Sequence, residues 1–175
     1  MSQLFLVEVP VGKDALQAAV QPIIDALHEV AKQASGDLIE VQYGRDLGLV
    51  YGIFEHRMAE VLDGLLRARN IEFNEIVPVQ LVGPTLEEVK AHRGAANYLV
   101  EWDIPEEIGL EQYLASKKAK APLYAKVPET TFMRTYVRED AVKCLCLYDA
   151  PDEDAVRRAR EAVNTPIDRL TRIGE

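Results

Sequence analysis

The chain has two cysteines, Cys144 and Cys146, separated by one residue in the stretch KCLCLYDAPDED. A Cys-x-Cys pair can be half of a metal site, a redox couple, or two small apolar residues on a strand. Same-face neighbours on a flat strand lie about 6.5 to 7 Å apart between Cα atoms, at the limit of disulfide geometry, so a disulfide between them is disfavoured. No CxxC partner or histidine cluster accompanies the pair, and the apolar interpretation stays open beside metal binding.

Composition limits the classes of protein to consider. The 175 residues are 48% hydrophobic and 28% charged, enough for one good core or two small ones. The formal net charge of −9 argues against nucleic-acid binding, which needs clustered Lys and Arg. The sequence has no apolar stretch of roughly 18 residues and no basic flank before the short N-terminal apolar run. We therefore expect a cytoplasmic protein that binds neither nucleic acid nor membrane.

An internal repeat organises the sequence. Leu6–Glu8 recurs as Leu99–Glu101, an offset of 93 residues, and the same offset places the apolar run Leu49–Glu55 on Val142–Tyr148. Each run is followed by a helical pattern and then by a strand-like end. The matching order of elements predicts a duplication.

Each half is expected to form strand, helix, strand, strand, helix and strand. The first half has strand patterns near 4–9, 38–43, 49–55 and 72–81, with helices between the first two and near 58–68. Pro22 interrupts the first helical stripe, so a kink or a fresh helix start is expected at Gln21. Thr85 as a possible N-cap predicts a short helix, which we interpret as the linker between the repeats. The expected organisation is a repeat at 1–83, a helical linker at 84–95 and a second repeat at 96–175.

These elements predict an α+β fold of two tandem ferredoxin-like βαββαβ repeats. Such a unit packs both helices on one face of a four-stranded antiparallel sheet and leaves the other face open. Two units in one chain commonly bury their open faces against each other. The expected architecture is a pseudo-dimeric α+β barrel.

Strand alternation then assigns side chains to faces. Cys144, Cys146 and Tyr148 share one face, and Leu145 and Leu147 share the other. The 93-residue offset matches the leucines to positions of the first half that meet the helices. The cysteines and Tyr148 are therefore expected on the open face.

A candidate metal site follows from this assignment. Glu101 lies on the less apolar row of its strand and is also expected on the open face, beside Cys144 and Cys146. Two thiols and a carboxylate in a semi-enclosed cleft can bind a transition-metal cation. The alternatives are that the cysteines are core residues and that Glu101 pairs with Arg134 or Arg138.

A small-molecule site is a second interpretation. Tyr51, Tyr136 and Tyr148 are expected to line the cleft between the repeats with an apolar wall and a few hydroxyls. The cluster of basic residues is expected to be solvated, with an acidic partner as the alternative. Its members are Lys117, Lys118, Lys120 and Lys126.

The second half also resembles a known family. The matching motifs are Arg134–Val137, Cys146–Asp152 and Pro166–Arg169, together with Tyr98–Glu101. They are similar to a ferredoxin-like family of unknown function that includes an actinobacterial nickel-binding protein. The resemblance implies nickel or another divalent transition metal as a cofactor. The first half resembles the family only through the repeat, and the chain departs from it at 117–129, where two prolines replace a longer amphipathic helix.

Three functions are therefore open. The first is a soluble transition-metal binder, the second a small-molecule carrier or enzyme that uses the cleft, and the third a scaffold that binds a protein partner or a second copy of itself. The sequence carries no P-loop, dinucleotide turn, nucleophile elbow or zinc-protease motif. A binding protein is expected rather than an enzyme.

Overall fold

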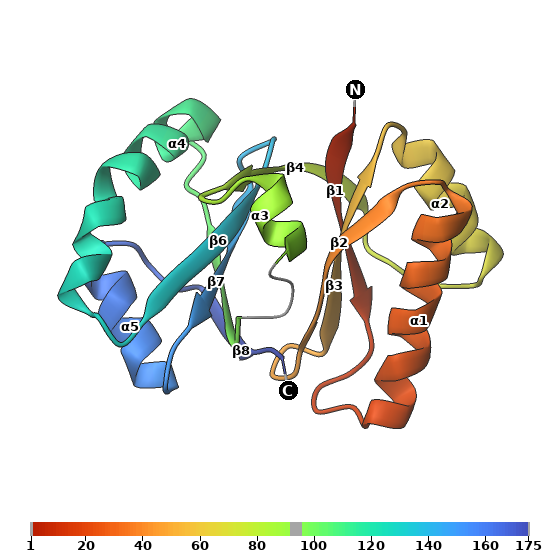
Figure 1. Ribbon diagram of the computed structural model, residues 1–175, viewed down its shortest axis with the longest axis horizontal. Coiled ribbons are helices and arrows are strands. Elements are labelled where there is room, and N and C mark those ends of the chain that lie inside the picture. Colours follow the sequence, from red (N-terminus) through yellow and green to blue (C-terminus); the bar gives the residue numbers. More distant parts are fainter. Residues whose placement is uncertain (1, 92–95, 175) are drawn as a thin grey trace. The chain divides into compact units, whose positions relative to one another are not determined.

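The computed structural model describes residues 2–91 and 96–174. The chain forms two compact units, one of residues 1–79 with 86–94 and the other of residues 80–85 with 95–175 (Figure 1). None of the described helices is long and apolar enough to cross a membrane.

The first unit is a βαββαβ unit followed by a short helix. Its elements are β1 (Gln3–Pro10), α1 (Gln17–Gln33), β2 (Asp37–Gly44), β3 (Leu49–His56), α2 (Ala59–Ala68), β4 (Ile76–Val82) and α3 (Leu86–Ala91). The strands lie in the order β2-β3-β1-β4, and their pairings are antiparallel. This is the ferredoxin-like arrangement expected from the sequence. The expected end of the helical linker, near residue 95, lies outside the described residues.

The second unit repeats this order. Its elements are β5 (Tyr98–Asp103), α4 (Gly109–Lys120), the 3-10 helix η1 (Ala121–Lys126), β6 (Thr131–Arg138), β7 (Lys143–Asp149), α5 (Glu153–Ala162) and β8 (Arg169–Arg172). The strand order β6-β7-β5-β8 corresponds to that of the first unit. Despite its prolines, 117–129 contributes the end of α4 and then η1, so this connection is helical along much of its length.

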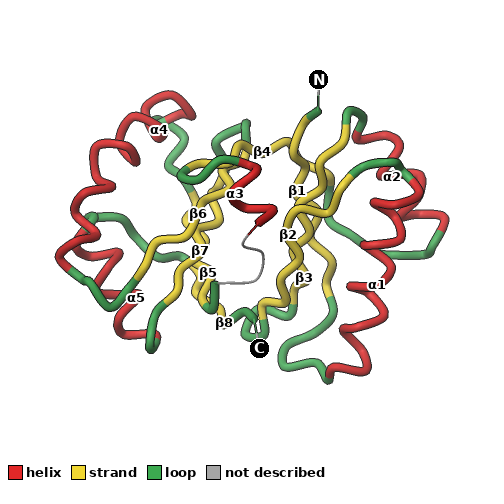
Figure 2. Tube along the Cα trace, in the orientation of Figure 1, coloured by secondary structure: helices red, strands yellow, loops and turns green. Residues whose placement is uncertain are grey.

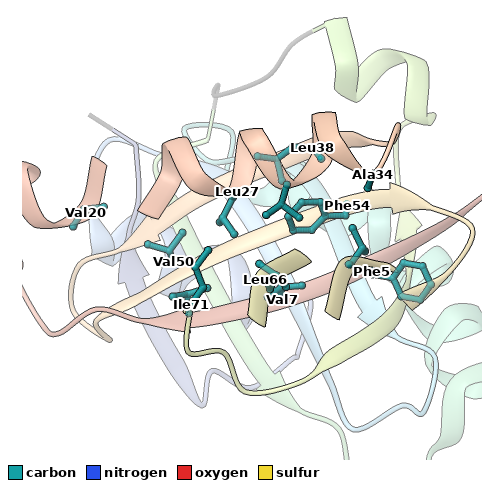
Figure 3. Close-up of a cluster of buried hydrophobic side chains, with 14 residues drawn as sticks. Phe5, Val7, Val20, Leu27, Ala34, Leu38, Val50, Phe54, Leu66 and Ile71 are labelled. Atoms are coloured by element: carbon teal, nitrogen blue, oxygen red, sulfur yellow. The ribbon is translucent and has the colours of Figure 1, made fainter. Parts of the chain in front are cut away.

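Helices α1 and α2 cover one face of the sheet in the first unit, and α4 and α5 cover one face in the second (Figure 2). Each unit has a hydrophobic core between these helices and its sheet. In the first unit, Val7, Val50 and Phe54 point from the sheet toward Leu27 of α1 and Leu66 of α2 (Figure 3). All five side chains are fully buried. Burial of side chains of this size stabilises the fold by about 1.5 to 3 kcal/mol each.

Pro22 lies inside one continuous helix, so the expected fresh start at Gln21 was wrong. Helix α1 begins at Gln17 and runs through the proline to Gln33. Proline removes a single backbone hydrogen bond here, close to the helix start. The burial of Val20, Leu27 and Val30 on one stripe of α1 offsets that loss.

The pairing registers of the two units correspond, but the offset of 93 residues read from the sequence holds for the first strands and not for the third. Val7 of β1 pairs with Gly52, and Val100 of β5 pairs with Cys146. The offset is therefore 93 between the first strands (Val7 to Val100) and 94 between the third strands (Gly52 to Cys146). A one-residue change moves every side chain of a strand to the opposite face.

A β-bulge marks the same place in both units. The register shifts between Leu38 and Glu40 in β2, and between Phe132 and Arg134 in β6. Ile39 and Met133, the residues inside these shifts, are again 94 positions apart. The two units therefore share their local irregularities as well as their strand order.

The ends of α5 agree with their sequence signals. Asp152 is the N-cap, and its carboxylate accepts a hydrogen bond from the Ala155 amide at 2.8 Å. Asn164, just after the helix, has a φ of 50°, the left-handed conformation expected of it. These signals fix where α5 begins and ends, and they leave open which side chains it buries.

Candidate functional site

The cysteines of β7 face the helices of their own unit, so their expected position on the open face was wrong. Cys144, Cys146 and Tyr148 belong to the buried cluster that contains Tyr113 of α4 and Val156 of α5. The cause is the one-residue change in offset described above, which assigns the cysteines to the face first given to Leu145 and Leu147. Both thiols are free and buried.

Cys146 lies at the centre of a polar cluster. Its sulfur accepts a hydrogen bond from Thr135 Oγ1 at 3.2 Å and lies 3.9 Å from the sulfur of Cys144. Two cations approach the same sulfur, Arg160 Nη1 at 3.5 Å and Lys117 Nζ at 3.7 Å. Strands β6 and β7 and helices α4 and α5 each contribute to this environment.

This environment lowers the pKa of Cys146 well below the ordinary value of a thiol. The hydrogen bond from Cys144 contributes most, and the charges of Lys117 and Arg160 and the Thr135 hydroxyl add to it, against the effect of burial. The same pairing raises the pKa of Cys144. Within the pair, the proton is therefore favoured on Cys144 and the negative charge on Cys146.

Arg160 is a buried cation, 2% exposed, and none of the ion pairs in the described part of the chain includes it. Its Nη1 also donates to Tyr148 Oη at 3.1 Å, and its Nη2 donates to the Pro166 carbonyl at 2.6 Å. Burial opposes its charge, but the Cys146 thiolate and Tyr148 outweigh burial and raise its pKa. Because a buried charge without a counter-charge is strongly destabilising, Cys146 is the natural partner of Arg160.

A cavity of about 240 Å³ adjoins this cluster, between α4, η1 and the end of α5. Trp102, Tyr113 and Tyr124 contribute aromatic walls. Three cations line the cavity as well, and no carboxylate is among its lining residues. They are Lys117, Lys120 and Arg160.

Two lining residues carry polar atoms without a partner. Among the described residues, the buried side-chain nitrogen and oxygen atoms that lack a hydrogen bond are Tyr113 Oη and Arg160 Nε. Both side chains line the cavity. A buried unsatisfied donor costs about 1 to 3 kcal/mol, so such atoms are few in folded proteins and each one needs an explanation.

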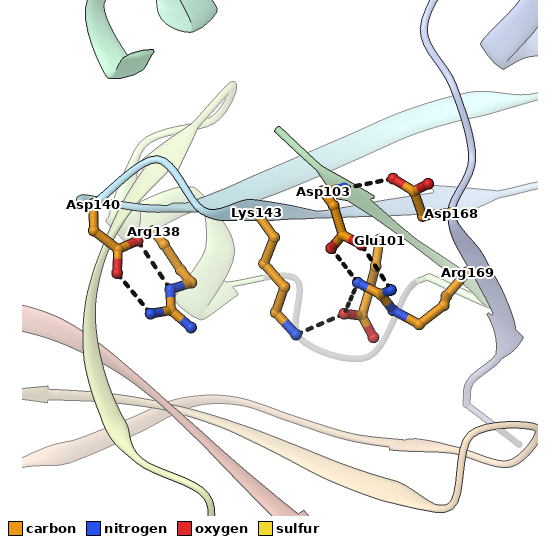
Figure 4. A network of polar contacts seen from close by, with 7 residues as sticks. All are labelled: Glu101, Asp103, Arg138, Asp140, Lys143, Asp168 and Arg169. Carbon is orange, nitrogen blue, oxygen red and sulfur yellow. Dashed lines mark hydrogen bonds and ion pairs between the residues drawn. The ribbon is translucent and has the colours of Figure 1, made fainter. Parts of the chain in front are cut away.

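Glu101 lies on the other face of the sheet from the thiols. It pairs in register with Leu145, and its carboxylate accepts from Lys143 Nζ at 2.6 Å and lies 3.2 Å from Arg169 Nη2 (Figure 4). Arg169 also contacts Asp103, so the carboxylate belongs to a network of charges. Cys144, Cys146 and Glu101 therefore do not form the expected group. The thiols lie on one face of the sheet at β5 and β7, and the carboxylate lies on the opposite face.

The three tyrosines expected to line one cleft divide between the two faces. Tyr136 pairs with Leu145 and therefore faces away from α4 and α5, whereas Tyr148 lies in the helix-side cluster. Tyr51 of the first unit alternates with the core residue Val50 and faces away from α1 and α2. Tyr148 thus belongs with the cysteines and not with the other two tyrosines.

The donors around the thiols fit a metal only in part. The described residues contain no group of three or more His, Cys, Asp or Glu side chains that could hold a metal ion. Nickel and other divalent metals are usually bound by more donors than two sulfurs. The pair therefore does not form a complete divalent site from the residues described.

The sequence reasoning did not place Lys117 or Arg160 beside the cysteines. Lys117 was expected to be solvated with its neighbours, yet its ammonium lies near the Cys146 sulfur and 4.4 Å from the centre of the Phe132 ring. Arg160 follows Val156 by four residues on the buried stripe of α5. A charged residue on an apolar helical stripe is the signal that identifies it.

The fold is shared with solved structures of the dimeric α+β barrel class. A protein assigned provisionally as a chlorite dismutase is 13% identical, with 99% of this chain and 95% of that chain aligned and a TM-score of 0.56. A provisional monooxygenase from Fusobacterium nucleatum is 12% identical, with 99% and 91% aligned and a TM-score of 0.51. A heme-binding protein from Thermus thermophilus is 10% identical, with 100% and 89% aligned and a TM-score of 0.50. At these identities the similarity establishes the fold alone, and it confirms the α+β class expected from the sequence.

Residues 98–173 match the sequence profile of the family described as nickel responsive protein SCO4226-like. The match falls in the second unit and confirms the resemblance seen in the second half of the sequence. No curated protein matches the chain.

Proposed function

We propose that the second unit binds a small organic anion with an aromatic or apolar body in the cavity beside α4. The observation that carries this proposal is that Tyr113 Oη and Arg160 Nε, buried and without partners, belong to side chains lining the same cavity. An acceptor atom of a ligand would satisfy both donors. An anionic acceptor would also interact with the charge of Arg160.

The lining matches such a ligand in shape and charge. Small-molecule cavities typically combine apolar walls with a few directed polar groups, and at about 240 Å³ this one suits a compact molecule. Trp102 and Tyr113 lie with ring centroids 6.0 Å apart and provide an aromatic wall. The chain carries a formal net charge of −9, whereas the cavity lining contains cations and no carboxylate. The lining is therefore opposite in charge to the chain as a whole.

The test uses benzoate as the probe and benzamide as its neutral counterpart of similar shape. Calorimetric titration of the full chain should show binding of benzoate and much weaker binding of benzamide, because only the carboxylate interacts with the cations. Chemical shifts measured by NMR should change at Trp102 and Tyr113. Equal affinity for both probes, or shift changes confined to other parts of the chain, would contradict the proposal.

Two lysines of α4 provide a matched pair of variants. Lys117 lines the cavity, whereas Lys118 is exposed and does not. Lys117→Met should weaken benzoate binding and Lys118→Met should leave it unchanged, although both remove one positive charge. If both variants weaken binding equally, the effect comes from net charge and not from the cavity.

Binding of a transition metal such as nickel by the thiols is a second candidate function. Two observations favour it: the sulfurs of Cys144 and Cys146 lie 3.9 Å apart, and residues 98–173 match a family described as nickel responsive. The experiment measures the nickel content of untagged protein after incubation with Ni(II), for the wild type and for the Cys144→Ser, Cys146→Ser double variant. Nickel content that is the same in both proteins would remove the thiols from the proposal.

We also infer that the two units are copies of one repeat, in keeping with the duplication expected from the sequence. The shared strand order and the bulges at Ile39 and Met133 support it. The copy without thiols then serves as an internal control for the copy that has them.

A further inference from the structure

The cavity beside α4 carries positive charge that no ion pair compensates. Its lining cations are Lys117, Lys120 and Arg160, and none of them pairs with a carboxylate in the described part of the chain. The one acidic group in contact with two of them is the thiol of Cys146. Three cations against at most one thiolate leave at least two positive charges, whether Cys146 is neutral or ionised.

The hydrogen bonds of these cations do not change that charge. Lys120 Nζ donates to the Asn164 carbonyl at 3.2 Å, and Arg160 Nη2 donates to the Pro166 carbonyl at 2.6 Å. Carbonyl oxygens are neutral acceptors, so each satisfies one donor and leaves the charge in place. Charges in a partly enclosed cavity are screened less than charges on an open surface, so a ligand that matches them in number is favoured.

One anionic group can contact two of the cations at once. Lys117 Nζ and Arg160 Nη1 lie 3.7 Å and 3.5 Å from the same sulfur, so the sum of these distances, about 7 Å, is the largest separation the two nitrogens can have. A charged nitrogen lies about 2.8 Å from an oxygen that it contacts, so two oxygens of one tetrahedral group can bridge that separation. Arg160 Nε, on the same guanidinium, and Tyr113 Oη are the buried donors without partners among the described residues.

We propose that the ligand of this cavity is a phosphate monoester, whose two negative charges lie on one tetrahedral group. The inference rests on the function proposed for the cavity and names the class of ligand. A phosphate monoester carries a charge of about −1.5 to −2 at pH 7 and three acceptor oxygens, whereas a carboxylate carries one charge and two oxygens. The phosphate therefore matches both the uncompensated charge and the number of donors. No carboxylate lines the cavity, so the chain's own cations, and not a divalent metal, hold the phosphate.

The size and walls of the cavity limit the organic part of the ester. A volume of about 240 Å³ lies below the usual range of small-molecule cavities, roughly 300 to 1,000 Å³, which favours a compact molecule. Trp102 and Tyr124 line the same cavity and offer aromatic surface to the organic part. The expected ligand is therefore a small aromatic or apolar alcohol that carries one phosphate.

The test compares three probes by calorimetric titration of the full chain in the presence of EDTA. Phenyl phosphate is a dianion at about pH 7.5, because its second pKa is near 6, and benzenesulfonate is a monoanion of similar tetrahedral shape. Isophthalate is a dianion whose charges lie on two separate groups. We expect phenyl phosphate to bind about tenfold more tightly than benzenesulfonate, because its second charge meets a second cation, and more tightly than isophthalate.

Two double variants test whether the preference comes from the cavity. Lys117→Met with Lys120→Met removes two lining cations, whereas Lys118→Met with Lys126→Met removes two exposed cations that do not line the cavity. Both double variants lower the net charge of the chain by two. The first should reduce the preference for phenyl phosphate over benzenesulfonate to about threefold or less, and the second should leave it unchanged. An equal reduction in both would show that net charge, and not the cavity, sets the preference, which would overturn the proposal.

The comparison of probes on the wild-type protein needs no variant and decides the proposal by itself. Equal affinity for phenyl phosphate and benzenesulfonate would overturn the dianionic ligand, and isophthalate binding as tightly as phenyl phosphate would overturn the single tetrahedral group. Binding of phenyl phosphate that EDTA abolishes would show that a metal holds the phosphate. If benzoate binds and phenyl phosphate does not, the phosphate inference fails while the function proposed for the cavity stands. If none of the probes binds, benzoate included, both fail.

Discussion

The two units build the same sheet and helices around different cores. Corresponding positions of β3 and β7, and of α2 and α5, lie 94 residues apart, and four of these pairs point into the cores. The pairs are Val50 and Cys144, Gly52 and Cys146, Phe54 and Tyr148, and Leu66 and Arg160. Where the first unit has apolar side chains or no side chain, the second has two thiols, a phenol and a guanidinium.

This difference between the two cores shows which residues the fold requires and which occur in the second unit alone. The first unit shows that the βαββαβ arrangement packs with Leu66 and Phe54 at these positions. The polar cluster of the second unit is therefore not required to form the fold. Buried polar groups are costly unless they are satisfied, and a unit that retains them beside a cavity has the features of a binding site.

The largest effect is expected when the first unit receives the arginine of the second. Leu66→Arg places a cation in a core that has no thiolate and no phenol at the corresponding positions. We expect the free energy of unfolding, measured by urea denaturation, to fall by about 3 to 5 kcal/mol, the cost of an uncompensated buried charge. Arg67→Leu, at an exposed neighbouring position, is the control and should change stability little. A loss no larger for Leu66→Arg than for this control would show that a buried arginine here needs no partner.

The reciprocal change, Arg160→Leu, should raise the pKa of Cys146, because the guanidinium is one of the groups that lower it. Proton uptake by Cys146 then limits the loss of stability. We expect a stability loss smaller than that of Leu66→Arg and a decrease in the thiolate ultraviolet absorbance at neutral pH. An unchanged absorbance would mean that Cys144, Lys117 and Thr135 maintain the charge on Cys146 without Arg160.

The pH dependence of stability provides a third comparison, between the wild type and Cys146→Ala. The pKa of Cys146 is lower in the folded state than in the unfolded state, so between the two values the unfolded state binds more protons. The stabilisation by this thiolate is complete above the unfolded thiol pKa of about 8.5 and is lost as pH falls through the folded value.

The free energy of unfolding of the wild type should therefore decrease relative to Cys146→Ala as pH is lowered below about 8.5, by at most about 1.4 kcal/mol per pH unit. The range above that pH is avoided, because the raised pKa of Cys144 acts with the opposite sign there. Other groups around the sulfur that carry or can carry charge are Lys117, Arg160, Tyr113, Tyr124 and Tyr148. A difference independent of pH would show that Cys146 is a neutral thiol in the folded state.

The smallest expected effect is that of Tyr113→Phe, which removes a buried hydroxyl without a partner. Stability of the ligand-free protein should rise by about 1 kcal/mol, because an unsatisfied polar group is removed. Benzoate affinity should fall in the same variant, because the hydroxyl can no longer donate to the carboxylate. Thermal unfolding with and without benzoate measures both changes, and a variant that is less stable without ligand would indicate a structural role for the hydroxyl.

The order of elements was predictable because its signals are local. Apolar periodicity located β1, β2, β3 and α2 to within a few residues, and Asp152 and Asn164 marked the ends of α5. The helix start expected at Gln21 failed, because tertiary burial along α1 outweighs the effect of one proline. Matching motifs also identified the similarity of the second half to the family described as nickel responsive.

The face of β7 was not predictable in the same way. Cys144 and Cys146 are 1% and 0% exposed, and Leu145 and Leu147 on the other face are 2% and 1% exposed. A strand buried on both faces gives no alternation of polar and apolar residues from which to choose. The prediction of the face on which the cysteines lie then depended on the repeat offset. An error of one residue in that offset assigned them to the wrong face.

The sequence by itself determined which residues form strands and helices, because spacing, capping residues and turn residues act over a few positions. It also determined that thiols and cations are present in the second half. Only the tertiary structure decided that Lys117, Arg160 and Cys146 meet beside one cavity and that Glu101 does not join them. Their meeting depends on strand register and on the rotation of α4 and α5 about their axes, which are set by packing between segments far apart in the chain.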